Sequence, residues 1–154
     1  MSKPRADFVD VKVHVKFKLA GLWTSLMFCY VYGDYFGLWQ PGTVRGMLQG
    51  RMDPFGAVTQ NVLLGTSAML AIPALMVFLS LALMPALNRW LNIVLGVLYT
   101  AIMLVTMPGA WEFYIFFGII EVILTLLIVW NAWRWPAIAP GAPGNRSDPS
   151  GLPL

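Results

Sequence analysis

Four stretches of the chain are almost continuously apolar, and each is long enough to cross a bilayer as a helix. They cover residues 19–39, 62–84, 90–107 and 111–133. A hydrocarbon core of about 30 Å requires roughly 20 apolar residues in a helix. Because backbone amides in hydrocarbon must be hydrogen-bonded within their own segment, helices are expected rather than open strands. The pattern predicts an all-α integral membrane bundle of four transmembrane helices within residues 19–135.

The ends of these stretches carry the expected markers. Tryptophans lie at the edges, where an aromatic belt meets the lipid headgroups: Trp39, Trp90, Trp111, Trp133 and Trp135. Pro85 separates the second stretch from the third, and "MPGAW" (residues 107–111) predicts a tight hairpin between the third and the fourth. Proline and glycine at these places end helices, so the four-helix division is supported by local chemistry as well as by length.

Three segments lie outside the predicted helices. Residues 136–154 are rich in Pro, Gly and Ser, which predicts a disordered tail. The loop of residues 41–56 has Val44, Met47 and Leu48 at helical spacing, which predicts a short interfacial helix.

The basic juxtamembrane segment, residues 1–18, has a different pattern. Within residues 8–18, apolar and polar residues alternate strictly from Val9 to Lys18, which is the period of a strand. The chain has no second strand-like segment to pair with it. Either it pairs with another molecule, or it lies on anionic lipid through Lys12, Lys16 and Lys18, as a surface segment or as a helical extension.

Composition agrees with a membrane protein. Of the 154 residues 58% are hydrophobic and only 11% are charged, against about 25% charged in soluble domains. Eight of the ten basic residues fall on one side of a four-span topology: Lys3, Arg5, Lys12, Lys16, Lys18, Arg89, Arg134 and Arg146. The positive-inside rule then places both termini in the cytoplasm.

Several function classes receive no support from the sequence. No Cys/His spacing suggests a metal, no nucleophile or phosphate-loop motif is present, and nothing suggests a nucleic-acid partner. We therefore expect no catalytic residue, no metal and no cofactor, and the chain gives no reason to class it as an enzyme. Its expected partners are the lipid bilayer and either another membrane protein or a second copy of itself.

Asp34 is a carboxyl placed among aromatic and apolar residues. The segment "FCYVYGDYFGLW" (residues 28–39) brackets it with Gly33 and Gly37, a G-x-x-x-G pair that lets a neighbouring backbone come close. A charge facing lipid is costly, so Asp34 is expected to face protein or water, on a helical stripe with Tyr30. This spacing predicts that Asp34 lies where two helices nearly touch.

Glu121 lies near the middle of the fourth apolar stretch, on a stripe with Tyr114, Gly118 and Thr125. No Lys or Arg falls within the four stretches, so a protonated, hydrogen-bonded acid is the expected state in apolar surroundings. Gly118 is a predicted helix-packing position. Candidate partners for the carboxyl are Tyr30, Tyr99, Asn92, Thr66 and Ser67.

Two functions remain open at this point. The small size, short loops and lack of motifs favour an accessory or interaction subunit of a membrane complex. The alternative is a small-molecule or proton-coupled binding or transport protein, with a polar site formed by Asp34, Glu121, Tyr30, Tyr99 and Tyr114.

The basic N-terminal segment, "LW" (Leu22, Trp23) and "YVYGDYF" (residues 30–36) together resemble a bacterial family of small four-helix membrane proteins, a domain of unknown function. The architecture is also loosely similar to the DoxX-like group, which includes subunits of redox complexes. The resemblance implies the four-helix fold and a bacterial inner membrane, and it implies no reaction.

Overall fold

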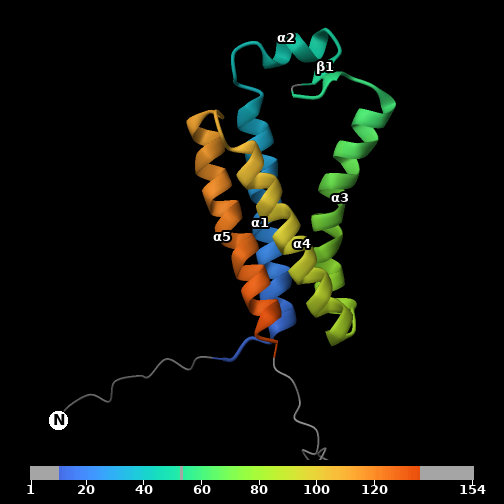
Figure 1. The fold of residues 1–154 in the computed structure, drawn as a ribbon, viewed down its shortest axis with the longest axis vertical. Coiled ribbons are helices and arrows are strands. Elements are labelled where there is room, and N and C mark those ends of the chain that lie inside the picture. The colour runs from blue at the N-terminus through green and yellow to red at the C-terminus, as the bar shows by residue number, and fades with distance from the viewer. Residues whose placement is uncertain (1–10, 53, 136–154) are drawn as a thin grey trace, which may run out of the picture.

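The computed structural model describes residues 11–52 and 54–135, and this part of the chain folds into five helices and one short hairpin (Figure 1). The long helices are α1 (Val15–Gly37), α3 (Gln60–Ala82), α4 (Pro85–Thr106) and α5 (Glu112–Trp133). The connection between α1 and α3 contains α2 (Thr43–Leu48) and two antiparallel strands, β1 (Arg51–Met52) and β2 (Gly56–Ala57). The predicted tail of residues 136–154 and residues 1–10 of the basic segment lie outside the described residues.

The all-helical prediction is confirmed, although helix ends shift by up to five residues. The helix predicted over residues 90–107 begins at Pro85. Proline fits the first helical position because its missing N–H would have no partner there. The short helix predicted within residues 41–56 is present as α2, but the two-residue strands that follow it were not predicted.

The strand pattern of residues 8–18 does not produce a strand in its described part. Residues 11–14 are irregular, and residues 15–18 form the first turn of α1. His14 caps this helix, since its Nδ1 accepts a hydrogen bond from the Lys16 backbone N–H at 3.3 Å. A helix cap together with tertiary contacts therefore outweighs the alternating pattern, and α1 begins at Val15, four residues before the predicted start of the first apolar stretch.

Lys16, for which a contact with lipid was predicted, makes two hydrogen bonds within the chain. Its Nζ donates to the carbonyl oxygens of Leu81 at 3.0 Å and Leu83 at 2.7 Å, at the C-terminus of α3. The last carbonyls of a helix lack intrahelical donors and carry partial negative charge, so an ammonium group is a favourable partner. Lys12 and Lys18 are exposed, and their contact with lipid stays a prediction.

The four long helices do not pack equally. Helix α1 packs against both α3 and α5, and α4 packs mainly against α5. Helices α3 and α4 are consecutive but contact each other little, and they diverge from their shared turn toward the α2 end of the molecule (Figure 1). The first and last described residues lie together at the opposite end, which we call the terminal end.

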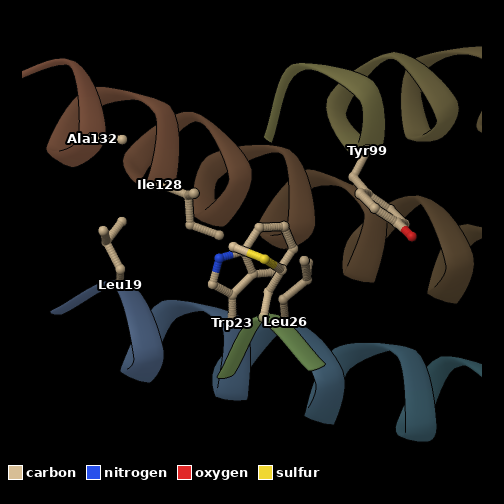
Figure 2. Packing of buried hydrophobic residues seen from close by; sticks show 7 residues of the cluster. Leu19, Trp23, Leu26, Tyr99, Ile128 and Ala132 are labelled. Atoms are coloured by element: carbon tan, nitrogen blue, oxygen red, sulfur yellow. The ribbon is translucent and has the colours of Figure 1, made fainter. Parts of the chain in front are cut away.

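The hydrophobic core joins α1 to α5. Leu19, Trp23 and Leu26 of α1 are fully buried and point toward Ile128 and Ala132 of α5 (Figure 2). Met76 of α3 and Tyr99 of α4 complete this cluster. Because Leu19, Trp23 and Ala132 belong to the ends of α1 and α5 nearest the termini, tight packing is concentrated at the terminal half of the bundle.

Large apolar side chains cover much of the outer surface of the helices, among them Leu64, Phe78, Val105 and Phe116. Five of the buried residues in the described chain are polar or charged, namely Ser80, Asn88, Asn92, Glu121 and Thr125. This distribution suits helices surrounded by lipid, where packing and interhelical hydrogen bonds hold helices together.

Candidate functional site

A cavity of about 600 Å³ lies in the half of the bundle nearest α2, between α1, α3, α4 and α5. It is lined by all five residues that the sequence grouped into a polar site: Tyr30, Asp34, Tyr99, Tyr114 and Glu121. Three helices supply them, and apolar side chains supply most of the remaining wall. The α1–α3 connection closes part of the mouth with Gln40, Pro54 and Phe55.

Glu121 is the most deeply placed acid. The buried residues of α5 follow one stripe, Gly118, Glu121, Thr125, Ile128 and Ala132, which turns the carboxyl toward the bundle interior. The residue is only 3% exposed, and its Oε2 is buried without a hydrogen-bond partner. No hydrogen bond among the described residues uses this carboxyl. An unpaired polar atom in such a place calls for an explanation, such as a role in binding.

None of the five hydrogen-bond partners suggested for Glu121 by the sequence bonds to it in the described chain. Tyr99 donates to the Met69 carbonyl at 2.6 Å, and Thr66 donates to carbonyls of its own helix. Asn92 belongs to a separate network at the terminal end, and Tyr30 and Ser67 donate no hydrogen bond to Glu121. The predicted hydrogen bond to the carboxyl is therefore not formed within the described residues.

Tyr99 occupies its place because of a proline. Pro73 lacks an N–H, so the carbonyl of Met69, four residues earlier in α3, has no helical donor. The Tyr99 hydroxyl supplies the missing hydrogen bond. The Tyr99 ring also packs edge-on against Trp23, with centroids 6.1 Å apart, and lies 6.4 Å from the Tyr30 ring. Tyr99 therefore separates the packed core from the cavity.

Asp34 lines the cavity from α1, but its setting differs from the predicted one. A Cβ added at Gly33 or Gly37 would meet nothing within 4 Å, and Asp34 is exposed. The predicted close crossing of helices at this G-x-x-x-G pair is thus wrong within the described chain. Helices α1 and α3 diverge here, and this divergence creates the space that the cavity occupies.

Close helix contact occurs instead between α4 and α5. A Cβ at Gly96 would lie 2.7 Å from Cγ2 of Val129 and 3.3 Å from the Thr125 carbonyl oxygen. Gly118, a predicted packing position, lies against the side chains of Met103 and Met107. Across the same contact, the Thr100 hydroxyl donates to Oγ1 of Thr125 at 2.7 Å. Helices α4 and α5 therefore form a close pair on one side of the cavity.

A buried polar network at the terminal end was missed by the sequence reasoning. Trp23 Nε1 donates to Asn92 Oδ1 at 2.7 Å, and Asn92 Nδ2 donates to Asn88 Oδ1 at 2.6 Å. Asn88 Nδ2 donates in turn to the Ser80 carbonyl at 2.6 Å. The sequence feature that could have predicted this network is the helical spacing of polar and small residues on one face of α4. That face contains Asn88, Asn92, Gly96, Tyr99 and Met103.

The cavity is acidic and aromatic. Asp34 and Glu121 supply two carboxyls, and no Lys, Arg or His is among the residues that line it. Tyrosine hydroxyls supply donors around the wall, and Tyr114 also donates to Oγ1 of Thr106 at 3.0 Å. Within residues 11–52 and 54–135 no group of three or more His, Cys, Asp or Glu side chains is arranged to hold a metal. The cavity wall therefore combines two carboxyls and tyrosine hydroxyls with aromatic and apolar surface.

Three of the helices, α3, α4 and α5, are long and apolar enough to cross a membrane, which is the mark of an integral membrane protein. A family model matches residues 8–139, and the chain belongs to that family, the family of unknown function DUF6326. No curated protein and no solved structure matches the chain.

Proposed function

We propose that α1 is a fourth membrane span and that both ends of the chain lie in the cytoplasm of a bacterial cell, below its inner membrane. Helix α1 is 23 residues long, the same length as α3, and packs between α3 and α5. Helix α1 is less apolar than α3, α4 and α5 because it contains the charged residues Lys16, Lys18 and Asp34. The lysines stand at the terminal end, and Asp34 lines the cavity, so none of the three needs to face the centre of the lipid.

Charge supports this orientation. The basic residues at the terminal end are Lys12, Lys16, Lys18, Arg89 and Arg134, and those in the α1–α3 connection are Arg45 and Arg51. An excess of Lys and Arg in short segments marks the cytoplasmic side. The terminal end is therefore assigned to the cytoplasm and the α2 end to the opposite side.

The function that the geometry supports best is the binding of a small molecule within the membrane. A single observation carries this proposal: the Glu121 carboxyl is almost fully buried, has no partner for Oε2, and lines a cavity of about 600 Å³. Ligand cavities are commonly about 300–1,000 Å³, mostly apolar, with a few polar groups that orient the ligand. A carboxyl used only to hold helices together is expected to have a protein partner.

Two glycine substitutions in α1 test the proposal. Gly33 lines the cavity and has open space at its Cβ, so Gly33→Leu fills the cavity without meeting another atom at that point. Gly21→Leu is the matched control, since Gly21 also has open space but lies outside the cavity. Both changes add the same side chain to the same helix, and both improve helix propensity by about 1 kcal/mol.

The measurement is the set of molecules that stays bound through purification, identified by native mass spectrometry. The wild type and Gly21→Leu are expected to retain a small molecule that Gly33→Leu has lost. Identical spectra for all three proteins would contradict the proposal that the cavity binds a small molecule. A protein partner that copurifies equally with all three would favour the accessory-subunit alternative.

A further inference from the structure

The cavity combines two carboxyls with aromatic rings and contains no basic side chain, and this combination specifies a ligand class. Asp34 and Glu121 lie on different helices, α1 and α5, and share the cavity wall with Tyr30, Tyr99, Tyr114 and Trp111. We infer that the cavity binds a lipophilic organic cation, such as an aromatic ammonium or phosphonium ion. This inference rests on the proposed binding function and adds the charge and character of the ligand.

The charge follows from what the cavity lacks. Each ionised carboxyl in a site of low dielectric needs an opposite charge, and none is provided by the lining residues. Glu121 lines the cavity and its Oε2 has no donor in the described chain, so a bound cation would supply the charge that the carboxyl lacks. An anionic ligand would instead meet two acidic side chains and no basic residue to receive it. A cation is thus the ligand that removes the largest electrostatic penalty.

The residues that line the cavity indicate that the ligand is lipophilic. Aromatic faces attract cations through the negative charge of the ring, most strongly where water is excluded. Trp111, just before α5, and Phe117, within α5, contribute aromatic rings to the wall. Met69 and Leu70 of α3 and Ile102 of α4 contribute apolar surface. A small hydrated metal ion would leave this surface unused. An organic cation uses both the carboxyls and the rings.

The two carboxyls differ in their exposure, and the helices around them diverge on one side of the cavity. Helices α3 and α4 contact each other little and diverge toward the α2 end, and both line the cavity (Figure 1). Asp34 is exposed at the α1 side of the cavity, whereas Glu121 is 3% exposed. Asp34 is therefore placed to meet an entering cation, and Glu121 is placed to hold it.

Two ions of the same shape and opposite charge test the inference. Tetraphenylphosphonium and tetraphenylborate are added to the full-length protein in nanodiscs of phosphatidylcholine, which carries no net charge, and binding is measured by equilibrium dialysis. Gly33→Leu nanodiscs give the background due to lipid. We expect saturable binding of the cation and none of the anion. Glu121→Gln should weaken cation binding about tenfold or more, and Asp34→Asn should weaken it less.

Glu112→Gln is the matched control, since Glu112 begins α5 but does not line the cavity, and it should leave binding unchanged. Equal binding of the two ions, no binding of the cation, or full cation affinity in a folded Glu121→Gln protein would each overturn the inference. If the wild type retains a neutral molecule that Gly33→Leu excludes, the proposed binding function is supported. Only the inference that the ligand is a cation is then contradicted.

Discussion

Glu121 is a buried acid whose polar atoms do not contribute a hydrogen bond to the described bundle. A buried polar atom without a partner costs about 1–3 kcal/mol, and Glu121 Oε2 is such an atom. The same helix offers a contrast one turn later, where Thr125 is fully buried and its hydroxyl accepts a hydrogen bond from Thr100 at 2.7 Å. Two positions four residues apart therefore differ in whether their polar group stabilises the bundle.

This difference gives a prediction for unfolding in detergent. Glu121→Met removes an unpaired carboxyl and keeps similar volume, so it should leave the free energy of unfolding unchanged or raise it by about 1 kcal/mol. Thr125→Val should lower it by about 1 kcal/mol, because the Thr100 hydroxyl loses an acceptor. Thermal unfolding followed by circular dichroism compares the two. An equal loss of stability in both variants would make Glu121 a structural residue.

Helical spacing in the sequence was enough to group residues that the structure places around one cavity, while their role as a binding site stays a prediction. The stripes that contain Asp34 and Glu121 were visible from spacings of three and four, and the five residues assigned to one site do line one cavity. The partners of those residues were not predictable in the same way. Tyr99 bonds to Met69 only because Pro73 frees that carbonyl and because α4 lies beside α3 there. Pairing across helices depends on packing that a single sequence does not display.

At the scale of elements, α3 and α4 are joined by few contacts, and the Tyr99 hydroxyl is one of the bonds that link them. Pro73→Ala restores a backbone N–H that can serve the Met69 carbonyl within α3. We therefore predict that Tyr99→Phe costs about 1 kcal/mol in the wild type and clearly less in the Pro73→Ala background. A double-mutant cycle of thermal unfolding measures the coupling. Additive effects of the two changes would show that the hydroxyl does not compensate for the proline.

The position of the close helix contact could not be read from the glycine pattern. The pair Gly33 and Gly37 has the spacing of a packing motif but open space at both Cβ positions. Gly96, which belongs to no such pair, lies against Val129 and the Thr125 carbonyl. A glycine permits close approach of a second helix, whereas the side chains around it determine whether another helix packs there. The stripe of polar and small residues on α4, Asn88, Asn92 and Gly96, indicated the bundle interior better than the G-x-x-x-G pair did.

The whole molecule divides into a packed half and a hollow half. At the terminal end, the core around Trp23 and the Asn88–Asn92 network fix the helices, and Lys16 binds the end of α3. At the other end the helices diverge around the cavity, which the α1–α3 connection partly covers. Movement of α3 would therefore change the cavity while the terminal end holds the bundle together.

The last prediction concerns how the whole chain crosses the membrane. In a Cys29→Ala background, single cysteines replace Val11, at the terminal end, and Gln49, after α2; both positions are exposed. If α1 spans the membrane and the terminal end is cytoplasmic, an impermeant thiol reagent added to intact cells should label only the Gln49→Cys protein. Both should react after the membrane is permeabilised. Labelling of Val11→Cys alone would reverse the orientation. The same result at both positions in intact cells would mean that α1 does not cross, because these residues stand at opposite ends of that helix.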